Sequence, residues 1–517
     1  MKIGLDNRRR TGITRRQFLG GLGAGATAIG VRNVLGPDTA EARAPATRSD
    51  RFSRMFDLPP FAEASPSLEA ALREIGRPGG LLDAGDALER GPVDLIVDPA
   101  LSANNPAHTA GTTFMGQFMD HDMTFDIGSA LGVAMEPRTA TNGRTPSFDL
   151  DSMYGGGPTA SPQLYEADRA RLRVESGGLF EDLPRTSDNT AIIADPRNDE
   201  HAIIAGLHAA FLLFHNRAVE VARGSGPSRP AGLFAQARRL TTWHYQWMVL
   251  HEFLPLFVGQ GLVDDIVANG PRYYRPGTGE ASIPVEFQGA AFRFGHSMVR
   301  PSYRLNLAGD DGAPFFGMIF DPSQEGSPDP ADLRGGARAP RRFVGWQTFF
   351  DFADGQVKPN KRIDTKISTP LFTLPLGAIA SHDQPTALPQ RNLLRHLTWQ
   401  LPSGQAVARY IGVPVLATRD LAELRDFGLG LDRSTPLWYY ALKEAEVMES
   451  GLRLGPVGGM IVAEVIIGLL RADPASYLAV DPAWRPTLST RTGAITGEFR
   501  MVDFLTFAGV DPSSRGQ

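Results

Sequence analysis

Apolar side chains recur at three- and four-residue steps along much of this chain, the spacing that places them on one face of an α-helix. From Glu200 to Arg223 the recurring positions are Ile203, Ile204, Leu207, Phe211, Leu212, Phe214 and Val219. From about Leu233 to Phe257 they include Trp243, Trp247, Leu250 and Phe253, and the pattern stops near Gly259. Both segments are predicted to be largely buried helices.

Shorter helical patterns follow along the rest of the chain. They occupy Pro284 to Val299, Asn392 to Ile411, Thr418 to Phe427, Leu437 to Glu449 and Gly458 to Leu470. Between Ser302 and Arg341, Gly, Pro and Asp dominate, which predicts a long surface excursion with few regular elements. The sequence has no sustained period-two alternation, so the fold is predicted to be mainly α: one large helical domain with long loops and little β structure.

Composition and charge narrow the class of protein. The chain has 517 residues, of which 42% are hydrophobic and 21% charged, so it is globular and can bury a large core. Its net charge is -5, but the first 44 residues hold eight basic and three acidic side chains, which leaves -10 for the remainder. The net negative charge of residues 45–517 argues against a nucleic-acid partner, because phosphate binding depends on clustered Lys and Arg. Cysteine is absent, which excludes disulfides and thiolate metal ligands.

The N-terminal segment has the organisation of an export signal. Thr14-Arg15-Arg16-Gln17-Phe18-Leu19 is the twin-arginine pattern, followed by the Gly/Ala-rich apolar run Gly20 to Val31 and a small-residue cleavage site at Ala42-Arg43-Ala44. We therefore expect a signal peptide at 1–44, export by the twin-arginine route, and a periplasmic or extracellular location. A basic disordered tail is the alternative. Residues 45–100 are predicted to wrap the main body at 101–517, and no stable membrane span is expected because the apolar run is short.

Polar groups are concentrated in Gln117-Phe118-Met119-Asp120-His121-Asp122, directly after the apolar Phe114-Met115-Gly116. Burying unpaired polar side chains is costly, so such a cluster indicates chemistry. Three downstream segments are its candidate partners: Asp195-Pro196-Arg197-Asn198-Asp199-Glu200-His201, Phe292-Arg293-Phe294-Gly295-His296 and Leu388-Pro389-Gln390-Arg391-Asn392.

In this order and spacing, the four segments resemble the animal-type haem peroxidases, a family that includes myeloperoxidase, lactoperoxidase and peroxidasin and, more distantly, the cyclooxygenases and fatty-acid dioxygenases. The resemblance runs from about Pro106 to about Gly412. It implies a bacterial member of that family, with 101–517 as the catalytic domain and haem b as the cofactor. Its substrates would be hydrogen peroxide and a small reduced donor, a halide, pseudohalide or phenol, oxidised through a ferryl intermediate.

The resemblance places one histidine on each side of the haem. His296 matches the proximal ligand to iron, with Asn392 as the partner of its other ring nitrogen and Arg293 as a further residue of the cofactor site. His121 matches the distal acid/base. Taken singly, each histidine is as readily a core residue, and their joint occurrence with Arg197 and Asn392 favours the catalytic interpretation.

Two further residues complete the implied distal side. Arg197 matches the arginine that stabilises the departing oxygen as negative charge develops. Gln117 lies one helical turn before His121, faces the same side, and is placed to hold waters or a halide.

Asp120 and Glu200 are similar to the two carboxylates that form ester bonds to the haem methyl groups in the animal enzymes, so covalent haem attachment is predicted. The alternative is a helix-surface acid and a first-turn acid at a helix N-terminus. In myeloperoxidase a methionine follows the second carboxylate and forms a third, sulfonium link, whereas this chain has His201 there. The departure argues against efficient chloride oxidation and favours bromide, iodide, thiocyanate or phenolic donors.

The resemblance also implies a calcium site. Aligned on Tyr154-Gly155, the family's ligands fall on Thr145, Ser147 through its carbonyl, Asp149 and Asp151, with Asp122 reaching across from beside His121. The last position is usually Ser in the family, so a shift that uses Ser152 stays open, as does an ordinary Asp/Ser turn.

Two other functions stay open on the sequence. A fatty-acid dioxygenase or cyclooxygenase needs a radical-forming tyrosine three residues before the proximal histidine, where this chain has Arg293. A haem-less adhesion or matrix protein would keep the fold without the activity, which the presence of all four matched residues argues against. The sequence predicts neither the electron donor nor the oligomeric state.

Overall fold

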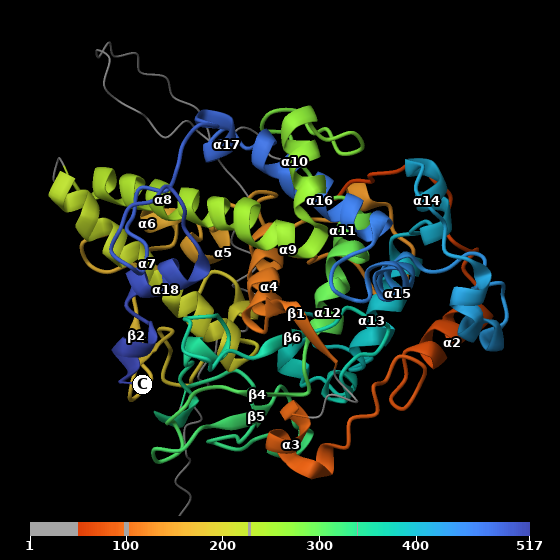
Figure 1. Cartoon of the computed structure of the whole chain (residues 1–517), viewed down its shortest axis with the longest axis horizontal. Coiled ribbons are helices and arrows are strands. Elements are labelled where there is room, and N and C mark those ends of the chain that lie inside the picture. Colours follow the sequence, from red (N-terminus) through yellow and green to blue (C-terminus); the bar gives the residue numbers. More distant parts are fainter. Residues whose placement is uncertain (1–49, 98–102, 226–228, 339, 517) are drawn as a thin grey trace, which may run out of the picture. The chain divides into compact units, whose positions relative to one another are not determined.

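The computed structural model describes residues 50–97, 103–225, 229–338 and 340–516 (Figure 1). These residues belong to one compact unit, Pro45–Gln517. The signal peptide predicted at 1–44 and the boundary predicted near residue 100 both lie outside the described residues, so they stay predictions.

Helices dominate the fold, as predicted. The longer ones are α2 (Pro66–Ile75), α4 (Gly111–Met123), α7 (Ala202–Ser225), α8 (Pro230–Met248), α10 (Gln260–Asn269), α13 (Leu388–Thr398), α14 (Gly404–Ile411), α15 (Leu437–Glu449), α16 (Pro456–Ala472) and α18 (Met501–Ala508). The short ones are α3 (Gly91–Val97), α5 (Asp151–Tyr154), α6 (Gly157–Ala160), α9 (Leu254–Val258), α11 (Val285–Gly289), α12 (Gly295–Met298) and α17 (Tyr477–Val480).

The β structure of the described residues consists of small antiparallel pairs. Strand β1 (Asn104–Thr109) pairs with β6 (Pro359–Lys361), β2 (Glu175–Ser176) with β3 (Glu181–Asp182), and β4 (Ser302–Arg304) with β5 (Phe316–Met318). Each sheet has two strands, so none forms a layer of its own.

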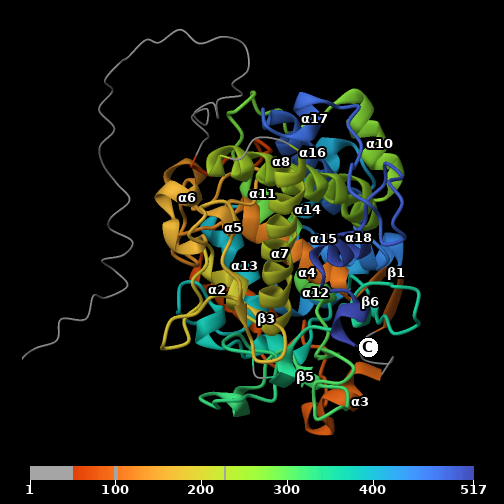
Figure 2. The same cartoon turned by 90° about the vertical axis from the view of Figure 1, so that its left-hand side faces the viewer.

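The strongest apolar pattern in the sequence forms the central helix α7, which packs against α8, α4 and α18 (Figures 1 and 2). Phe211 stacks on Phe118 of α4 with ring centroids 4.4 Å apart, and Phe214 stacks on Phe504 of α18 at 4.4 Å. By length and hydropathy the segment Ala202–Gly224 is apolar enough to cross a membrane, yet 83% of its most apolar window is buried inside the protein. That burial is typical of a core helix.

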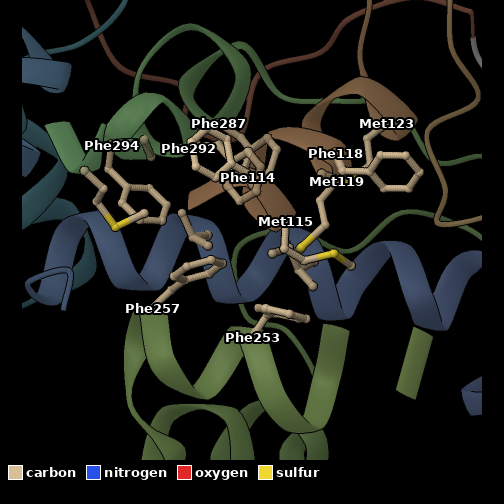
Figure 3. Close-up of a cluster of buried hydrophobic side chains, with 14 of the residues drawn as sticks. Phe114, Met115, Phe118, Met119, Met123, Phe253, Phe257, Phe287, Phe292 and Phe294 are labelled. Atoms are coloured by element: carbon tan, nitrogen blue, oxygen red, sulfur yellow. The ribbon is translucent and has the colours of Figure 1, made fainter. Parts of the chain in front are cut away.

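Helix α4 is anchored in the largest apolar cluster of the core. Figure 3 shows its side chains Phe114, Met115, Phe118 and Met119 against phenylalanines from three later segments of the chain, Phe253, Phe257, Phe287, Phe292 and Phe294. Gly111 begins the helix where a Cβ would lie 2.4 Å from the ring of Phe350, so only glycine allows this approach. The contacts fix the rotation of α4 about its axis, and with it the direction of its polar residues.

One predicted helix is wrong. Pro284 to Val299 is not continuous: it is divided into α11, the 3₁₀ turn η6 (Ala291–Phe294) and α12, which carries His296. The break occurs at Ala290, whose φ of -138° and ψ of -75° are not helical. Next to it, Gly289 lies against Trp399, where a Cβ would be 2.9 Å from the indole. This close approach is a tertiary contact that periodicity does not encode.

The other predicted elements differ mainly at their ends. The pattern from Leu233 to Phe257 forms α8, a short π-helical turn η5 (Val249–Phe253) and α9, and ends at Gly259 as predicted. The pattern from Asn392 to Ile411 is two helices, α13 and α14, and Thr418–Phe427 is the 3₁₀ segment η12. The described residues between 302 and 341, which leave out 339, are irregular apart from β4, β5 and short 3₁₀ turns.

The segment after residue 50 is fastened to the body by a buried carboxylate. Glu286 of α11 accepts hydrogen bonds from the backbone N–H of Met55 (2.9 Å) and Phe56 (3.2 Å). Phe52 and Phe56 are buried in the main core. Residues 50–61 therefore pack onto the same element that leads to His296.

Candidate active site

The two histidines singled out by the sequence line one cavity. Its volume is about 260 Å³, near the lower end of the range of small-molecule sites. His121 contributes from α4 and His296 from α12, two segments 175 residues apart in the chain. The cavity is also lined by Gln117, Asp120, Arg197, Glu200, His201, Arg293, Arg391 and Arg395, and by apolar side chains that include Phe257, Phe292, Phe320, Leu371, Leu374 and Ile379.

Arg197 is held in place by the turn that carries it. In the 3₁₀ turn η4 (Pro196–Asp199), Asp195 is the N-cap and accepts from the Arg197 backbone N–H at 3.0 Å. The same carboxylate accepts from Arg197 Nε (3.0 Å) and Nη2 (2.7 Å), and Arg144 Nε lies 3.2 Å from it. Burial raises the pKa of Asp195, but the charge and hydrogen bonds of Arg197 outweigh this and hold the pKa below its ordinary value.

The guanidinium of Arg197 spans the space between η4 and α4. Its Nη2 donates to the backbone carbonyls of His121 (3.1 Å) and Thr124 (2.6 Å), and its carbon lies 4.4 Å above the ring of Phe125. Nη1 lies 3.7 Å from Asp120 Oδ2. The arginine is therefore a fixed cation in the cavity wall.

The imidazole of His121 is buried and neutral. Burial, reinforced by the nearby charge of Arg197, lowers the pKa of His121 to about 3. Its Nδ1 lies 2.9 Å from Asn198 Oδ1. The ring is one wall of the cavity, where a neutral imidazole can accept a proton at neutral pH.

His296 also lines the cavity. Burial, reinforced by Arg293, lowers its pKa to about 3. Its Nδ1 lies 2.8 Å from the side-chain amide of Asn392 on α13, so the two residues are in contact, with the amide nitrogen and not its oxygen toward the ring. Asn392 Nδ2 faces His296, and its Oδ1 accepts from Arg293 Nη1 at 3.4 Å.

Gln117 lines the cavity one turn before His121, and its amide is engaged at both ends. Its Oε1 accepts from His201 Nε2 at 2.9 Å, and its Nε2 donates to Glu200 Oε2 at 3.2 Å. His201 Nδ1 in turn accepts from the Ile204 N–H at 3.2 Å. Burial raises the pKa of Glu200 to about 8, so this carboxyl is largely protonated at neutral pH.

Three further arginines line the cavity. Arg395 pairs with Asp126 at 2.9 Å and Arg391 with Asp383 at 3.0 Å. Arg293 pairs with no carboxylate of the described residues, and burial lowers its pKa to about 9. A buried cation facing a cavity without an acidic partner is suited to an anionic group of a ligand.

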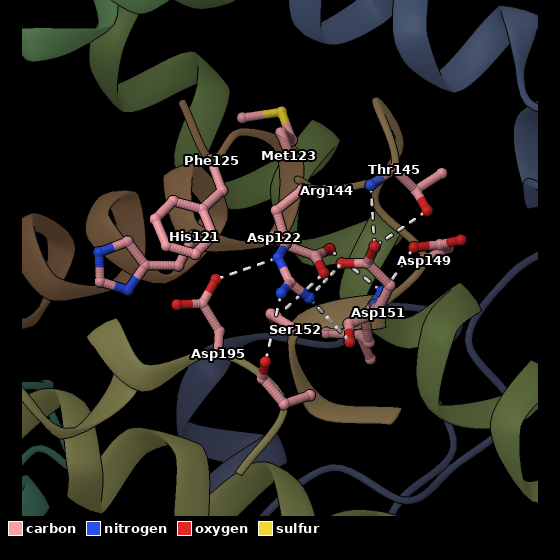
Figure 4. A network of polar contacts seen from close by, with 12 residues as sticks. His121, Asp122, Met123, Phe125, Arg144, Thr145, Asp149, Asp151, Ser152 and Asp195 are labelled. Atoms are coloured by element: carbon pink, nitrogen blue, oxygen red, sulfur yellow. Dashed lines mark hydrogen bonds and ion pairs between the residues drawn. The ribbon is translucent and has the colours of Figure 1, made fainter. Parts of the chain in front are cut away.

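Three of the predicted calcium ligands, Asp122, Asp149 and Asp151, lie together (Figure 4). Carboxylate oxygens of Asp122, Asp149 and Asp151 lie within 4.8 Å of one another. Burial and the other two carboxylates raise the pKa of Asp122 well above its ordinary value, and burial and Asp149 raise that of Asp151 to about 6. Asp122 Oδ2 accepts from the N–H of Leu150, a non-glycine residue with φ of 61°, so the carboxylate also supports a strained turn.

The other predicted ligands lie in the same loop. The hydroxyl of Thr145 donates to Asp151 at 2.9 Å, and that of Ser147 donates to Asp473 at 2.5 Å. The hydroxyl of Ser152 donates to Asp122 at 3.2 Å. Asp151 is a member of the carboxylate cluster and Ser152 contacts it, so both residues are placed to be the last calcium ligand.

Sequence reasoning missed several residues of this site. From the sequence alone, Asp195, Asn198 and His208 have no assigned role. Arg391 appears there only as a member of the segment Leu388–Asn392, and Arg395 carries no prediction. Asp195 before Pro196 is a helix-start signal that marks it as a cap. His208 lies fewer than two turns after the start of α7, and nothing local indicates that it contacts Asn198.

Comparison with known proteins shows which family the chain is similar to. Residues 126–323 match the family model described as animal haem peroxidase. The chain is 27% identical to thyroid peroxidase of Mus musculus over 233 residues, which are 40% of this chain and 25% of that protein. It is 26% identical to "Probable oxidoreductase PXDNL" of Homo sapiens over 247 residues, 46% of this chain and 16% of that protein. The chain is related to the animal haem peroxidases.

The similarity to the family model does not extend over the whole of the candidate site. The part matched by the animal haem peroxidase model contains Arg197 and His296, whereas His121 and Asn392 lie outside it. The chain spans about a quarter or less of the length of these two curated relatives.

Solved structures show the same helical fold. Peroxidase A from Dictyostelium discoideum matches with a TM-score of 0.57 and 16% identity, covering 85% of this chain and 93% of that one. A fatty acid alpha-dioxygenase of Arabidopsis thaliana matches with a TM-score of 0.51 and 14% identity, covering 83% and 73%. The fold is therefore common to peroxidases and dioxygenases, and the distinction between them depends on the site.

Proposed function

We propose that this protein is a haem-dependent peroxidase that reduces hydrogen peroxide to water and oxidises a small donor. The observation that carries the proposal is that His121 and His296, from distant segments, line one cavity together with Arg197. The reaction consumes two electrons and two protons per peroxide. The electrons come from a halide, a pseudohalide or two molecules of a phenol.

The residues present fit a haem. Bound between the two imidazoles, it would supply the iron that activates peroxide and stores the oxidising equivalents. His296 would hold the iron through Nε2, and Arg293, Arg391 and Arg395 give its acidic groups a cationic wall. With iron at Nε2, His296 would carry its hydrogen on Nδ1, so the Asn392 amide would have to turn its oxygen toward the ring and give up its acceptance from Arg293.

The distal residues would move protons and stabilise charge. His121 is neutral, so its free Nε2 would take the first proton of peroxide and return it to the departing oxygen as that oxygen leaves as water. Arg197, fixed by Asp195, would stabilise the negative charge that develops on the departing oxygen. Gln117 would orient water or a halide with the amide hydrogen that Glu200 does not use.

The covalent haem links stay part of the proposal. Asp120 and Glu200 both line the cavity, which supports their assignment as the ester-forming carboxylates. His201 also lines the cavity, so a sulfonium link is excluded there by the residue type. We therefore propose bromide, iodide, thiocyanate or phenolic donors rather than chloride.

A calcium ion is the second proposed cofactor. Three carboxylates within 4.8 Å of one another, two of them with raised pKa values, are suited to a divalent cation that prefers oxygen ligands. Exhaustive chelation should lower both the thermal midpoint and the peroxidase activity, and added Ca²⁺ should restore them. Unchanged stability after chelation would contradict the calcium site. Export by the twin-arginine route is likewise proposed, from the sequence of 1–44.

The dioxygenase alternative is disfavoured by the cavity wall. The residue three positions before His296 is Arg293, and no tyrosine is among the described residues that line the cavity. A radical-forming tyrosine is therefore not placed at the site of the proposed chemistry.

Two substitutions and a control test the proposal. We expect the haem-loaded chain to give a Soret band and to oxidise iodide, thiocyanate or phenols with peroxide. His296→Ala should lose haem, whereas His121→Ala should keep haem and react with peroxide roughly 10²- to 10⁴-fold more slowly. His251→Ala, outside the cavity, should behave like the parent. A colourless parent protein would favour the haem-less scaffold, and an unimpaired His121→Ala enzyme would exclude His121 as the acid/base.

A further inference from the structure

A chain of hydrogen bonds continues from His121 away from the cavity. His121 Nδ1 lies 2.9 Å from Asn198 Oδ1, and Asn198 Nδ2 lies 2.9 Å from His208 Nδ1. Asn198 is fully buried, and His121 and His208 are 4% and 1% exposed, so water does not compete for these contacts. Asn198 is thus the link between two imidazoles, and nothing in the family assignment uses it.

The donors and acceptors of this chain allow two consistent arrangements. In a neutral imidazole one ring nitrogen carries the hydrogen and the other has a lone pair, so each ring can donate at one nitrogen and accept at the other. In the arrangement observed, His121 Nδ1–H donates to Asn198 Oδ1, and Asn198 Nδ2–H donates to His208 Nδ1. If the amide turns by 180°, both bonds reverse and the hydrogen of His121 moves to Nε2. The amide of Asn198 therefore couples the tautomers of the two histidines.

Only one of the two arrangements suits a proton acceptor at the cavity. With the hydrogen on Nδ1, the lone pair of His121 is on Nε2, the nitrogen that is not bonded to Asn198. With the hydrogen on Nε2, the same ring has no lone pair to offer a bound peroxide.

The same turn holds His121 from two sides. Arg197 Nη2 donates to the backbone carbonyl of His121 at 3.1 Å, and the next residue, Asn198, accepts from its ring. The turn is itself fixed by Asp195, whose carbonyl accepts from the Asn198 N–H at 3.1 Å. One short segment therefore sets both the place and the ring orientation of His121.

We propose that Asn198 and His208 are positioning residues that keep His121 as its Nδ1–H tautomer, with the Nε2 lone pair directed into the cavity. The role of this tautomer in proton transfer rests on the proposed function, whereas the tautomer itself can be measured without haem. His208 accepts the second amide hydrogen of Asn198, so the amide can turn only if His208 also moves its own hydrogen to Nδ1.

The tautomer can be measured directly. The full chain with ¹³C,¹⁵N-labelled histidine is compared by NMR without haem and in the diamagnetic ferrous carbon monoxide form, with His121→Gln to assign the signal. We expect the ¹³Cδ2 and ¹⁵N shifts of an Nδ1–H imidazole at position 121. The Nε2–H pattern, which free histidine favours, would overturn the proposal. If no haem binds, the proposed function fails while the haem-free spectrum still decides the tautomer.

Variants test the consequence. In the ferric haem protein, Asn198→Leu should slow both peroxide reaction and HCN association about 10- to 100-fold, with haem content unchanged, because HCN must also give up its proton to a base. His208→Leu should act in the same direction. Asn198→Asp keeps an acceptor for Nδ1–H and should retain most of the rate.

The matched control is Asn216→Leu on the same helix as His208. The Asn216 side chain accepts from the N–H of Leu172 and donates to its carbonyl, both at 2.8 Å, and it does not line the cavity. Its loss should therefore lower the stability of the fold without lowering the rate of HCN association. Equal HCN rates in Asn198→Leu and the parent would refute the positioning role. If Asn198→Leu does not fold, the tautomer of the unsubstituted chain decides.

Discussion

Removing the Asp195 carboxylate should both destabilise the fold and release the distal arginine. The side chain is fully buried and interacts with two guanidinium groups: it accepts from Arg197 Nε, Nη2 and backbone N–H, and Arg144 Nε lies 3.2 Å away. Breaking a buried ion pair by removing one partner costs about 3–5 kcal/mol, because the other charge is left uncompensated. We expect a loss of that size in Asp195→Ala, measured by urea denaturation at pH 7.

The matched control is Asp168→Ala, which removes a carboxylate that also pairs with two arginines, Arg171 and Arg223. That cluster is partly exposed, with 25% of the Asp168 side chain accessible, so its loss should cost about 0–1 kcal/mol. The reaction with peroxide should slow only in Asp195→Ala, since Arg197 then loses its anchoring carboxylate and is left with the carbonyls of His121 and Thr124 and the more distant Asp120.

The stability difference should depend on pH in a defined direction. The folded-state pKa of Asp195 is below its ordinary value, so its contribution is present above the unfolded pKa of about 3.9 and is lost as pH falls toward the lower folded value. The parent and Asp195→Ala should therefore differ by a constant amount from pH 5 to 7 and converge below about pH 4. Equal costs for Asp195→Ala and Asp168→Ala would refute the assignment of Asp195 as the anchor of Arg197.

Two further substitutions test how the site is held. Gly335→Ala would place a Cβ 1.6 Å from the carbonyl oxygen of Asp199. It should lower the free energy of unfolding by about 1–3 kcal/mol or more and disturb the segment that carries Glu200. The control Gly261→Ala, whose Cβ would lie in open space, should be tolerated in the same unfolding assay. Glu286→Gln leaves one acceptor oxygen for the two backbone N–H groups of residues 55 and 56. Limited proteolysis within 50–61 should therefore be faster than in the parent. A cleavage rate equal to that of the parent would show that Glu286 does not hold this segment.

Local spacing predicted which residues of one helix share a face, but not their partners. Helix α15 has the predicted limits of Leu437 and Glu449, and Gln117 and His121 lie on the same cavity wall, because both depend on the helical repeat alone. The break at Ala290 depends on the approach of Gly289 to Trp399, 110 residues away in the chain, so periodicity could not reveal it.

The candidate site divides in the same way. Resemblance to a family indicated the residues of the cavity that its motifs contain, His121, Arg197 and His296. Asn198 bonds to a side chain 77 residues before it, and an isolated Asn after an Arg has no sequence signal for that contact. Residues that orient others are therefore found only once the tertiary structure places them together.

The central claim is that haem iron lies between the imidazoles of His121 and His296. Anomalous diffraction at the iron edge, from crystals of the haem-loaded chain, tests it most directly. We predict one strong peak in the cavity. It should lie within coordination distance of His296 Nε2, between that atom and the ring of His121. A peak elsewhere, or a cavity filled by side chains with no iron signal, would contradict the account.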